Sequence, residues 1–323
     1  MAYLDPDVIA VLVNVPVHIL YAFSNSSYKH YRLVSIPKKN GEMRQLTVPD
    51  NDLKFIQRSI YKRFLKGREV SPAAKAYVRK GNTAENAGPH VGKPMILKLD
   101  IRHFFDNVLF WHVKEKVFKS DEYTEEARVL LTYLCTYDGH LAQGAPSSPA
   151  ITNILMKDFD DEILRFCKRN GVCYTRYCDD MTFSGVFEPD EVISKVAWEL
   201  KKMGLYLNPA KTRVIRQGQQ MSVTGLVVND KVSVPAAYRR KIRQEIHYIW
   251  KYGVKDHLKH MGKNEYERYA YLNNLLGRIN YVLSVHKDDV EFMEYRDYVV
   301  KGCDGRLRYK ERPYLRLQKW HDF

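Results

Sequence analysis

Strand-like runs that end on aspartates constrain the fold of this chain more than any other feature. The mostly apolar run 95–101 carries Asp100 near its end, and two further runs within 173–184 flank a turn that holds Asp179 and Asp180. Strands that deliver carboxylates to one edge of a sheet gather hard oxygen ligands, which suit Mg²⁺. Two such ions about 3.5–4 Å apart can activate an attacking oxygen and stabilise a leaving group.

Taken singly, each aspartate site has a simpler explanation. An Asp-Asp pair in a turn usually serves the turn itself, and a lone aspartate at the end of a strand is usually solvated. The two sites together favour a metal, because no lysine adjoins either site in sequence and the chain is strongly basic. It has 52 Lys and Arg against 38 Asp and Glu, a formal net charge of +14, which predicts a polyanionic partner.

A membrane is the less favoured polyanion. The longest apolar stretch, 8–23, is interrupted by Asn14, Pro16 and His18 and is too short to span a bilayer. The five cysteines are odd in number and have no C-x-x-C spacing, so neither a disulfide framework nor a zinc site is indicated. We therefore expect a soluble, cytoplasmic chain that binds no membrane.

Hydrophobic periodicity predicts an α+β fold. The runs 31–37 and 43–49 form a hairpin signal around Asn40-Gly41, a favoured two-residue turn. Helices are expected at 51–66, 150–170 and 190–203, and short strands at 95–101, 173–177 and 181–184 and around residues 205, 214 and 223–228. From Ala236 the pattern becomes helical, basic and aromatic. The expected organisation is an extension over 1–30, a mixed body over 31–235 and a helical basic region over 236–323.

The order of three motifs resembles that of the reverse transcriptases. These motifs are Leu99-Asp-x-x-x-Phe-Phe105, Gln143-Gly-Ala-Pro-Ser-Ser-Pro149 and Tyr177-Cys-Asp-Asp180, which are similar to the palm motifs A, B and C. The segment 204–212 looks like motif D, and 37–44 looks like the fingers hairpin. The resemblance is collinear from about residue 33 to 228. It implies a right-hand polymerase, with fingers and palm (an antiparallel sheet plus helices) over 31–235 and a helical thumb over 236–323.

Three details resemble the retron branch of that superfamily. They are the Ala-Pro-Ser-Ser form of the second motif, the element Asn86-Ala-Gly-Pro-His90 and the triplet Val223-Thr-Gly225. One departure is Cys178, where these enzymes commonly have alanine. A small residue still fits that turn, so the departure concerns nucleotide packing more than activity.

The resemblance assigns catalytic and nucleotide-binding roles. Asp100, Asp179 and Asp180 would be the catalytic carboxylates and, with the Ile101 carbonyl, the ligands of two Mg²⁺ ions. The residues expected to contact the dNTP are Lys38, Lys39, Arg44, Phe105, Gln143 and Lys211. Arg44 with one of the lysines would clamp the triphosphate, Phe105 would exclude a ribose 2′-OH, and Lys211 would protonate the departing pyrophosphate. The alternatives are solvated charges for the cations and a core ring for Phe105.

The resemblance also assigns RNA contacts. The expected RNA-binding residues are Asn86, His90, Arg239, Arg240, Lys241 and Arg243. For Asn86 and His90 the alternative is a structured loop with a satisfied histidine. In the basic region the charges favour RNA, whereas the aromatic residues Tyr248, Trp250 and Tyr252 favour a core.

The implied function is that of a retron RNA-directed DNA polymerase. It would copy part of a cognate structured noncoding RNA into branched msDNA, primed from an RNA 2′-OH, and take part in antiphage defence by restraining a toxic effector protein. One alternative is a group II intron-like or abortive-infection reverse transcriptase. Others are an RNA-binding scaffold with a vestigial active site and a template-independent nucleotidyltransferase.

Overall fold

The computed structural model describes residues 3–37 and 41–301, and these divide into two compact units. The first unit takes in the described residues before Asn82 together with Met95–Val214. The second takes in Asn82–Pro94 together with the described residues from Ile215 onward. The domain boundaries expected at residues 30 and 235 stay predictions.

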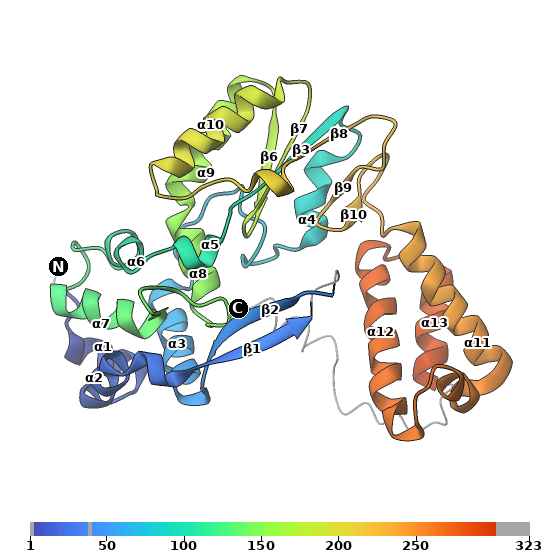
Figure 1. Ribbon diagram of the computed structural model, residues 1–323, viewed down its shortest axis with the longest axis horizontal. Coiled ribbons are helices and arrows are strands. Elements are labelled where there is room, and N and C mark those ends of the chain that lie inside the picture. The colour runs from blue at the N-terminus through green and yellow to red at the C-terminus, as the bar shows by residue number, and fades with distance from the viewer. Residues whose placement is uncertain (1–2, 38–40, 302–323) are drawn as a thin grey trace. The chain divides into compact units, whose positions relative to one another are not determined.

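The largest sheet has four strands, in the order β6-β7-β3-β8 (Figure 1). Its strands are β3 (Met95–Asp100), β6 (Cys173–Tyr177), β7 (Asp180–Ser184) and β8 (Arg213–Arg216). Both β3 and β6 pair antiparallel with β7. Side chains alternate between the faces of a strand, and Leu97, Leu99, Met181 and Phe183 are all buried in the same core cluster.

Helices complete the core of the first unit. Helix α9 (Lys157–Arg169) contributes Phe159 and Ile163 to the cluster, and α10 (Pro189–Lys201) contributes Val196. The other helices of this unit are α1 (Pro6–Val13), α2 (Val17–Asn25), α3 (Asn51–Ile60), α5 (Phe104–Asn107), α6 (Phe110–Lys116), α7 (Glu125–Cys135) and α8 (Ser148–Leu155). Its small sheets pair β1 (Tyr31–Pro37) with β2 (Met43–Pro49) and β4 (Thr136–Tyr137) with β5 (His140–Leu141).

The second unit combines a small hairpin with three longer helices. Helix α4 (Thr83–Ala87) contacts β9 (Ser222–Val223) and β10 (Leu226–Val227), which pair antiparallel. The longer helices are α11 (Ala236–His260), α12 (Arg268–Val285) and α13 (Val290–Lys301). Their buried apolar side chains include Ile246, Leu275 and Phe292.

Most of the expected elements are confirmed, and two differ. The paired hairpin strands end at Pro37 and begin again at Met43, and the turn expected at Asn40-Gly41 falls partly outside the described residues. The helix expected over 150–170 is two helices that begin at Ser148 and are separated by Met156. No strand forms at Leu205; among the described residues, Leu207 makes only an isolated bridge with Ile101.

No single helix among residues 3–37 and 41–301 is long and apolar enough to cross a membrane. Helices α1 and α2 reach the required length and apolarity only as a pair, and they are bent by 100° with respect to each other.

Candidate active site

Strand pairing in the first unit brings the predicted carboxylates together. Asp100 of β3 lies opposite Asp180 of β7, and the main-chain N–H of Ile101 donates to the carbonyl of Asp179 at 3.2 Å. Residues directly opposite in an antiparallel pair share a face, with Cβ atoms about 4.5–5.5 Å apart. The backbone positions of the three aspartates therefore lie together where β3 meets the β6–β7 hairpin, and Figure 1 shows these strands side by side.

A buried ion pair supports the turn that carries Asp179. Cys178 has a left-handed backbone, with φ of 63°, and its carbonyl accepts a hydrogen bond from Arg176 Nη1 at 2.9 Å. The Arg176 and Asp160 side chains are 0% exposed and 2.6 Å apart, and Asp160 also accepts from the hydroxyl of Tyr174. Sequence reasoning missed both residues. The available signal was Arg176 itself, because the alternation of side chains along 173–177 directs this charged residue to the core.

The carboxylates repel one another in their desolvated setting. Burial and then repulsion from Asp100 raise the pKa of Asp179. Desolvation, followed by repulsion from Asp179 and Asp100, raises the pKa of Asp180 to about 6. The cations Lys211 and Lys98 act in the opposite direction on Asp180 but do not reverse the shift. The cluster therefore has a local excess of negative charge.

Lys211 occupies a position that the sequence did not indicate. Its Nζ lies 2.7 Å from Asp100 Oδ2, and Asn208 Nδ2 donates to Asp100 Oδ1 at 3.2 Å. Desolvation acts to lower the pKa of Lys211, but its hydrogen bond and charge interaction with Asp100 raise it on balance. No lysine is adjacent to these aspartates in the sequence, but Lys211 contacts Asp100 in the folded chain. The premise that no lysine compensates the aspartates is therefore wrong.

The donor set has the chemistry that Mg²⁺ requires, namely carboxylate oxygens with an adjacent main-chain carbonyl at Ile101. Across the described ranges, however, no group of three or more His, Cys, Asp or Glu side chains is arranged as a metal-ligand set. In this arrangement the ammonium of Lys211 holds one carboxylate oxygen of Asp100. A divalent cation fits the charge and donor types of the cluster, provided that Lys211 leaves Asp100.

Two of the predicted nucleotide contacts meet directly. Arg44 on β2 donates through Nε to Gln143 Oε1 at 3.1 Å, and the N–H of Gly144 donates to the carbonyl of Thr47 at 3.0 Å. A Cβ on Gly144 would lie 2.7 Å from that carbonyl oxygen, so only glycine allows this approach. The loop before α8 is thereby docked on β2, while Lys38 and Lys39 lie outside the described residues.

Phe105 is buried, with 7% of its surface exposed. It belongs to helix α5 rather than a strand, and its ring lies 5.6 Å from that of Phe104 in an edge-on arrangement. Both rings are therefore buried side by side, whereas adjacent positions of a strand would direct them to opposite faces.

The two retron-like elements contact each other in the second unit. Asn86 Nδ2 lies 3.5 Å from Thr224 Oγ1, and that hydroxyl donates to the carbonyl of Thr83 at 3.2 Å. Thr224 and Gly225 both have positive φ, as a two-residue hairpin turn between β9 and β10 requires. The side chains of Asn86 and His90 are fully buried, so the expected direct RNA contact is not available to them in this conformation.

The predicted basic cluster of α11 divides into two kinds of residue. Arg239 pairs with Asp289 and Arg243 with Glu291, and both guanidinium groups lie over the ring of Phe292. By contrast, Arg240 and Lys241 are exposed. The first pair of cations therefore connects α11 to the α13 segment, and the second pair is open to a ligand.

The aromatic residues downstream on α11 are not core residues. The exposed fractions of Tyr248, Trp250 and Tyr252 are 38%, 59% and 52%, so the expectation that they pack inside the thumb is wrong.

Comparison with known proteins identifies similar chains. The profile of the family "Reverse transcriptase (RNA-dependent DNA polymerase)" matches residues 36–228. Retron Mx65 reverse transcriptase of Myxococcus xanthus is 30% identical over 262 residues, which cover 74% of this chain and 61% of that protein. Retron Ec86 reverse transcriptase of Escherichia coli is 33% identical over 229 residues, which cover 68% and 70%. Among solved structures, apo telomerase from Candida tropicalis, truncated from the C-terminal domain, is 14% identical with a TM-score of 0.43, covering 65% of this chain and 55% of that one.

Proposed function

The chain belongs to the reverse transcriptase family and to its retron members, and we propose that it is an RNA-directed DNA polymerase that copies part of a structured noncoding RNA. Its α+β fold, with an antiparallel palm sheet and helices, is that of a right-hand polymerase. The observation that carries the proposal is the pairing of Asp100 with Asp180 across β3 and β7, next to Asp179 at the hairpin turn.

The proposed reaction is attack of a hydroxyl on the α-phosphate of a dNTP, with pyrophosphate leaving. Asp100, Asp179 and Asp180, with the Ile101 carbonyl, would hold two Mg²⁺ ions, which when bound supply charge stabilisation and activation of the attacking oxygen. The chain itself mainly positions the reactants, since phosphoryl transfer requires little covalent chemistry from side chains. Arg176 fixes the turn that presents Asp179, as its hydrogen bond to the Cys178 carbonyl supports.

Lys211 has two successive roles in this proposal. Before nucleotide binding it neutralises Asp100, which limits repulsion within the carboxylate cluster. Its raised pKa keeps the ammonium charged. Once it leaves Asp100, the same ammonium can give a proton to the departing pyrophosphate.

Arg44 and Gln143 would bind the triphosphate side of the nucleotide. A guanidinium can hold phosphate oxygens through two hydrogen bonds, and Gln143 holds Arg44 by its Nε, which leaves the terminal nitrogens of Arg44 as donors. Lys38 or Lys39 would add charge beside Arg44. Phe105 would line the sugar side and disfavour a 2′-OH, because its buried ring has little freedom to move aside.

We further propose that the primer is an RNA 2′-OH, that the product is branched msDNA, and that the RNA–DNA complex restrains a toxic effector in antiphage defence. The relatives are named only as retron reverse transcriptases, so the primer, the branched product and the defence role all rest on the family resemblance. The exposed residues Arg240 and Lys241 remain candidates for contacts to the RNA backbone.

An extension assay tests the polymerase proposal. The purified chain is given a primed RNA template, four dNTPs and Mg²⁺, with EDTA as a matched control. We expect template-directed DNA in the first reaction and none in the second. The scaffold alternative predicts bound RNA without synthesis. A group II intron-like enzyme would extend any primed template equally well, whether or not the cognate RNA is present.

A further inference from the structure

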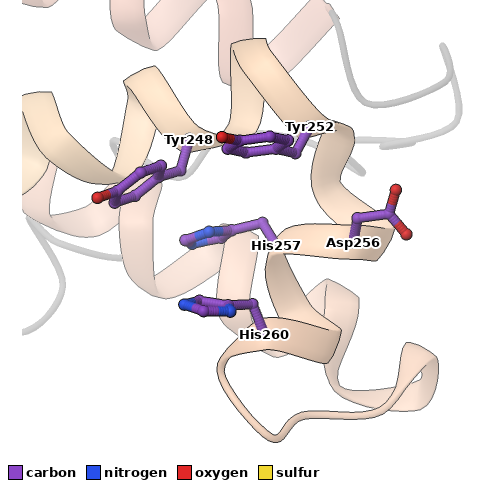
Figure 2. A pocket seen from close by; sticks show the side chains of 5 residues that line it. All are labelled: Tyr248, Tyr252, Asp256, His257 and His260. Carbon is purple, nitrogen blue, oxygen red and sulfur yellow. The ribbon is translucent and has the colours of Figure 1, made fainter.

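Helix α11 carries a pocket that the proposed polymerase chemistry does not use. Its volume is about 420 Å³, and it is lined by Tyr248, Tyr252, Asp256, His257 and His260. Figure 2 shows both tyrosines on the part of α11 before residue 253 and both histidines on the part after it, while the carboxylate of Asp256 points to the other side. Ligand pockets commonly measure about 300–1,000 Å³, so this one can hold a planar heterocycle.

A break in the helix creates this arrangement. Gly253 has φ of 76° and ψ of 163°, a backbone region that is essentially restricted to glycine. The chain changes direction there, which turns His257 back toward Tyr248. The rings of Tyr248 and His257 lie 6.0 Å apart and within 22° of parallel, and those of Tyr248 and Tyr252 lie 6.3 Å apart at 28°.

Hydrogen bonds fix the side chain of His257, which forms one wall of the pocket. His257 is 6% exposed, and its Nε2 lies 3.0 Å from the hydroxyl of Tyr271, which itself donates to Glu245 at 3.1 Å. Because that hydroxyl proton goes to the carboxylate, Nε2 of His257 is the donor in its contact. Burial lowers the pKa of His257, which favours the neutral ring, and with Nε2 as the donor its Nδ1 is an acceptor. Arg278 in turn holds Glu245.

The surroundings of the pocket are basic. Lys251, Lys255 and Lys259 are exposed on the same helix, and α11 as a whole has seven Lys and Arg residues against two Asp and Glu. Cations that meet phosphates beside aromatic rings that can stack on bases are the usual features of single-stranded nucleic acid sites. A purely apolar ligand would not account for the lysines, and a small anion without a ring would not account for the aromatic side chains.

We propose that the pocket lined by Tyr248, Tyr252, His257 and His260 captures one unpaired nucleobase of the RNA that the chain binds. The base stacks on the tyrosine rings, and the flanking phosphates meet the lysines. This inference rests on the proposed function, since it assigns a recognition site for the RNA that is copied.

A binding measurement with matched variants tests the proposal. The probe is an end-labelled single-stranded oligoribonucleotide of ten nucleotides and mixed sequence, compared with the same sequence as an RNA duplex. The variants are Tyr252→Ala and His260→Ala, both at exposed positions, and the control is Tyr266→Ala, a tyrosine of the same unit that is 97% exposed and outside the pocket. We expect Tyr252→Ala to weaken single-strand binding about five-fold or more, and His260→Ala to weaken it in the same direction, while duplex binding is unchanged.

Two results would overturn the pocket proposal. One is single-strand binding by both variants that equals that of Tyr266→Ala. The other is an equal loss on single strand and duplex, which would indicate a general effect on charge or folding. The extension assay on the wild type separates the two proposals. If the wild type extends the primer normally and the variants bind RNA normally, only the pocket proposal is rejected. If the variants lose single-strand binding but the wild type makes no DNA, only the polymerase proposal is rejected.

Discussion

Arg176 and Asp160 lie beneath the turn that presents Asp179, and together they decide how rigidly that carboxylate is held. Asp160 accepts from Arg176 through both oxygens and from Tyr174, and Arg176 also donates to the Cys178 carbonyl. Burying two charges is costly, so such a pair adds little net stability in comparison with apolar residues of similar size. Its contribution is better understood as fixing one conformation of the left-handed turn.

Replacing Arg176 by methionine tests the cost of breaking this pair. The change leaves the carboxylate of Asp160 buried without its main cation, so we expect the free energy of unfolding to fall by about 3–5 kcal/mol. Urea denaturation measures it. Arg165→Met is the matched control, because Arg165 is exposed and its pair with the half-buried Glu162 should contribute less than about 1 kcal/mol. Equal losses in the two variants would show that the buried pair has no special role.

The variant Asp179→Asn separates catalysis from folding. It is nearly isosteric and removes one of three mutually repelling charges, so we expect a melting temperature at or above that of the wild type and no detectable DNA synthesis. Thermal unfolding followed by circular dichroism and the extension assay give the two readouts. A much lower melting temperature would instead mark Asp179 as structural.

The sequence predicts a cluster of carboxylates but not the residues that contact them. Asp100, Asp179 and Asp180 follow from short motifs and strand ends, which are local features. The contact of Lys211 with Asp100 and that of Arg44 with Gln143 join segments about a hundred residues apart, so no local pattern could reveal them. The role of Arg176 could have been predicted, because the alternation of side chains along 173–177 directs this arginine to the core.

At the scale of elements, the helices depart from simple periodicity where the backbone breaks. The apolar pattern of 150–170 continues through Met156, so it could not reveal the division between α8 and α9. In α11 the single residue Gly253 breaks an otherwise helical segment. This glycine was the only feature of the local sequence that indicated a change of chain direction, and that change brings together the residues of the aromatic pocket.

The variant Gly253→Ala measures the importance of that break. No atom would crowd the new Cβ, so its effect comes from the backbone alone. We expect the free energy of unfolding to fall by about 1–3 kcal/mol, because alanine rarely adopts this conformation. In the control Gly277→Ala, within regular helix α12, the same change should stabilise the chain by about 0.5–1 kcal/mol. If both variants behaved alike, the conformation of Gly253 would not be required.

At the scale of the whole molecule, buried neutral histidines make stability depend on pH. Burial, assisted by Lys93, lowers the pKa of His90 from 6.5 to about 4. Burial also lowers the pKa values of His112, His257 and His286. Below pH 6.5 the unfolded chain takes up protons that the folded chain accepts only at lower pH, so stability is complete above that value and is lost as the pH falls.

For His90 the loss falls between about pH 6.5 and pH 4, with a slope of up to about 1.4 kcal/mol per pH unit. Urea denaturation at several pH values would measure it. We expect His90→Gln to flatten this part of the profile, although it also lowers stability at neutral pH, whereas His18→Gln, at an exposed position of α2, should leave the slope unchanged. A slope that does not change in His90→Gln would contradict the account.

The division of the chain into two units could not be predicted from the sequence. The segment Asn82–Pro94 precedes β3 but belongs to the second unit, where α4 contacts β9 and β10. The motifs at Asn86 and Val223 could each be recognised in the sequence, but their contact with each other depends on the tertiary structure. The overall class, an α+β body followed by helices, was predictable because it depends only on the order of the elements.

The most direct measurement of the central claim is the nature of the nucleic acid that the chain makes. The chain is expressed in bacteria with its flanking DNA and purified, and the bound nucleic acid is sequenced after RNase and debranching treatments, with Asp179→Asn in parallel. We predict a short DNA of uniform sequence, joined to a structured RNA through a 2′,5′ bond and absent from the variant. RNA without DNA in the wild type, or heterogeneous unbranched DNA, would contradict the account.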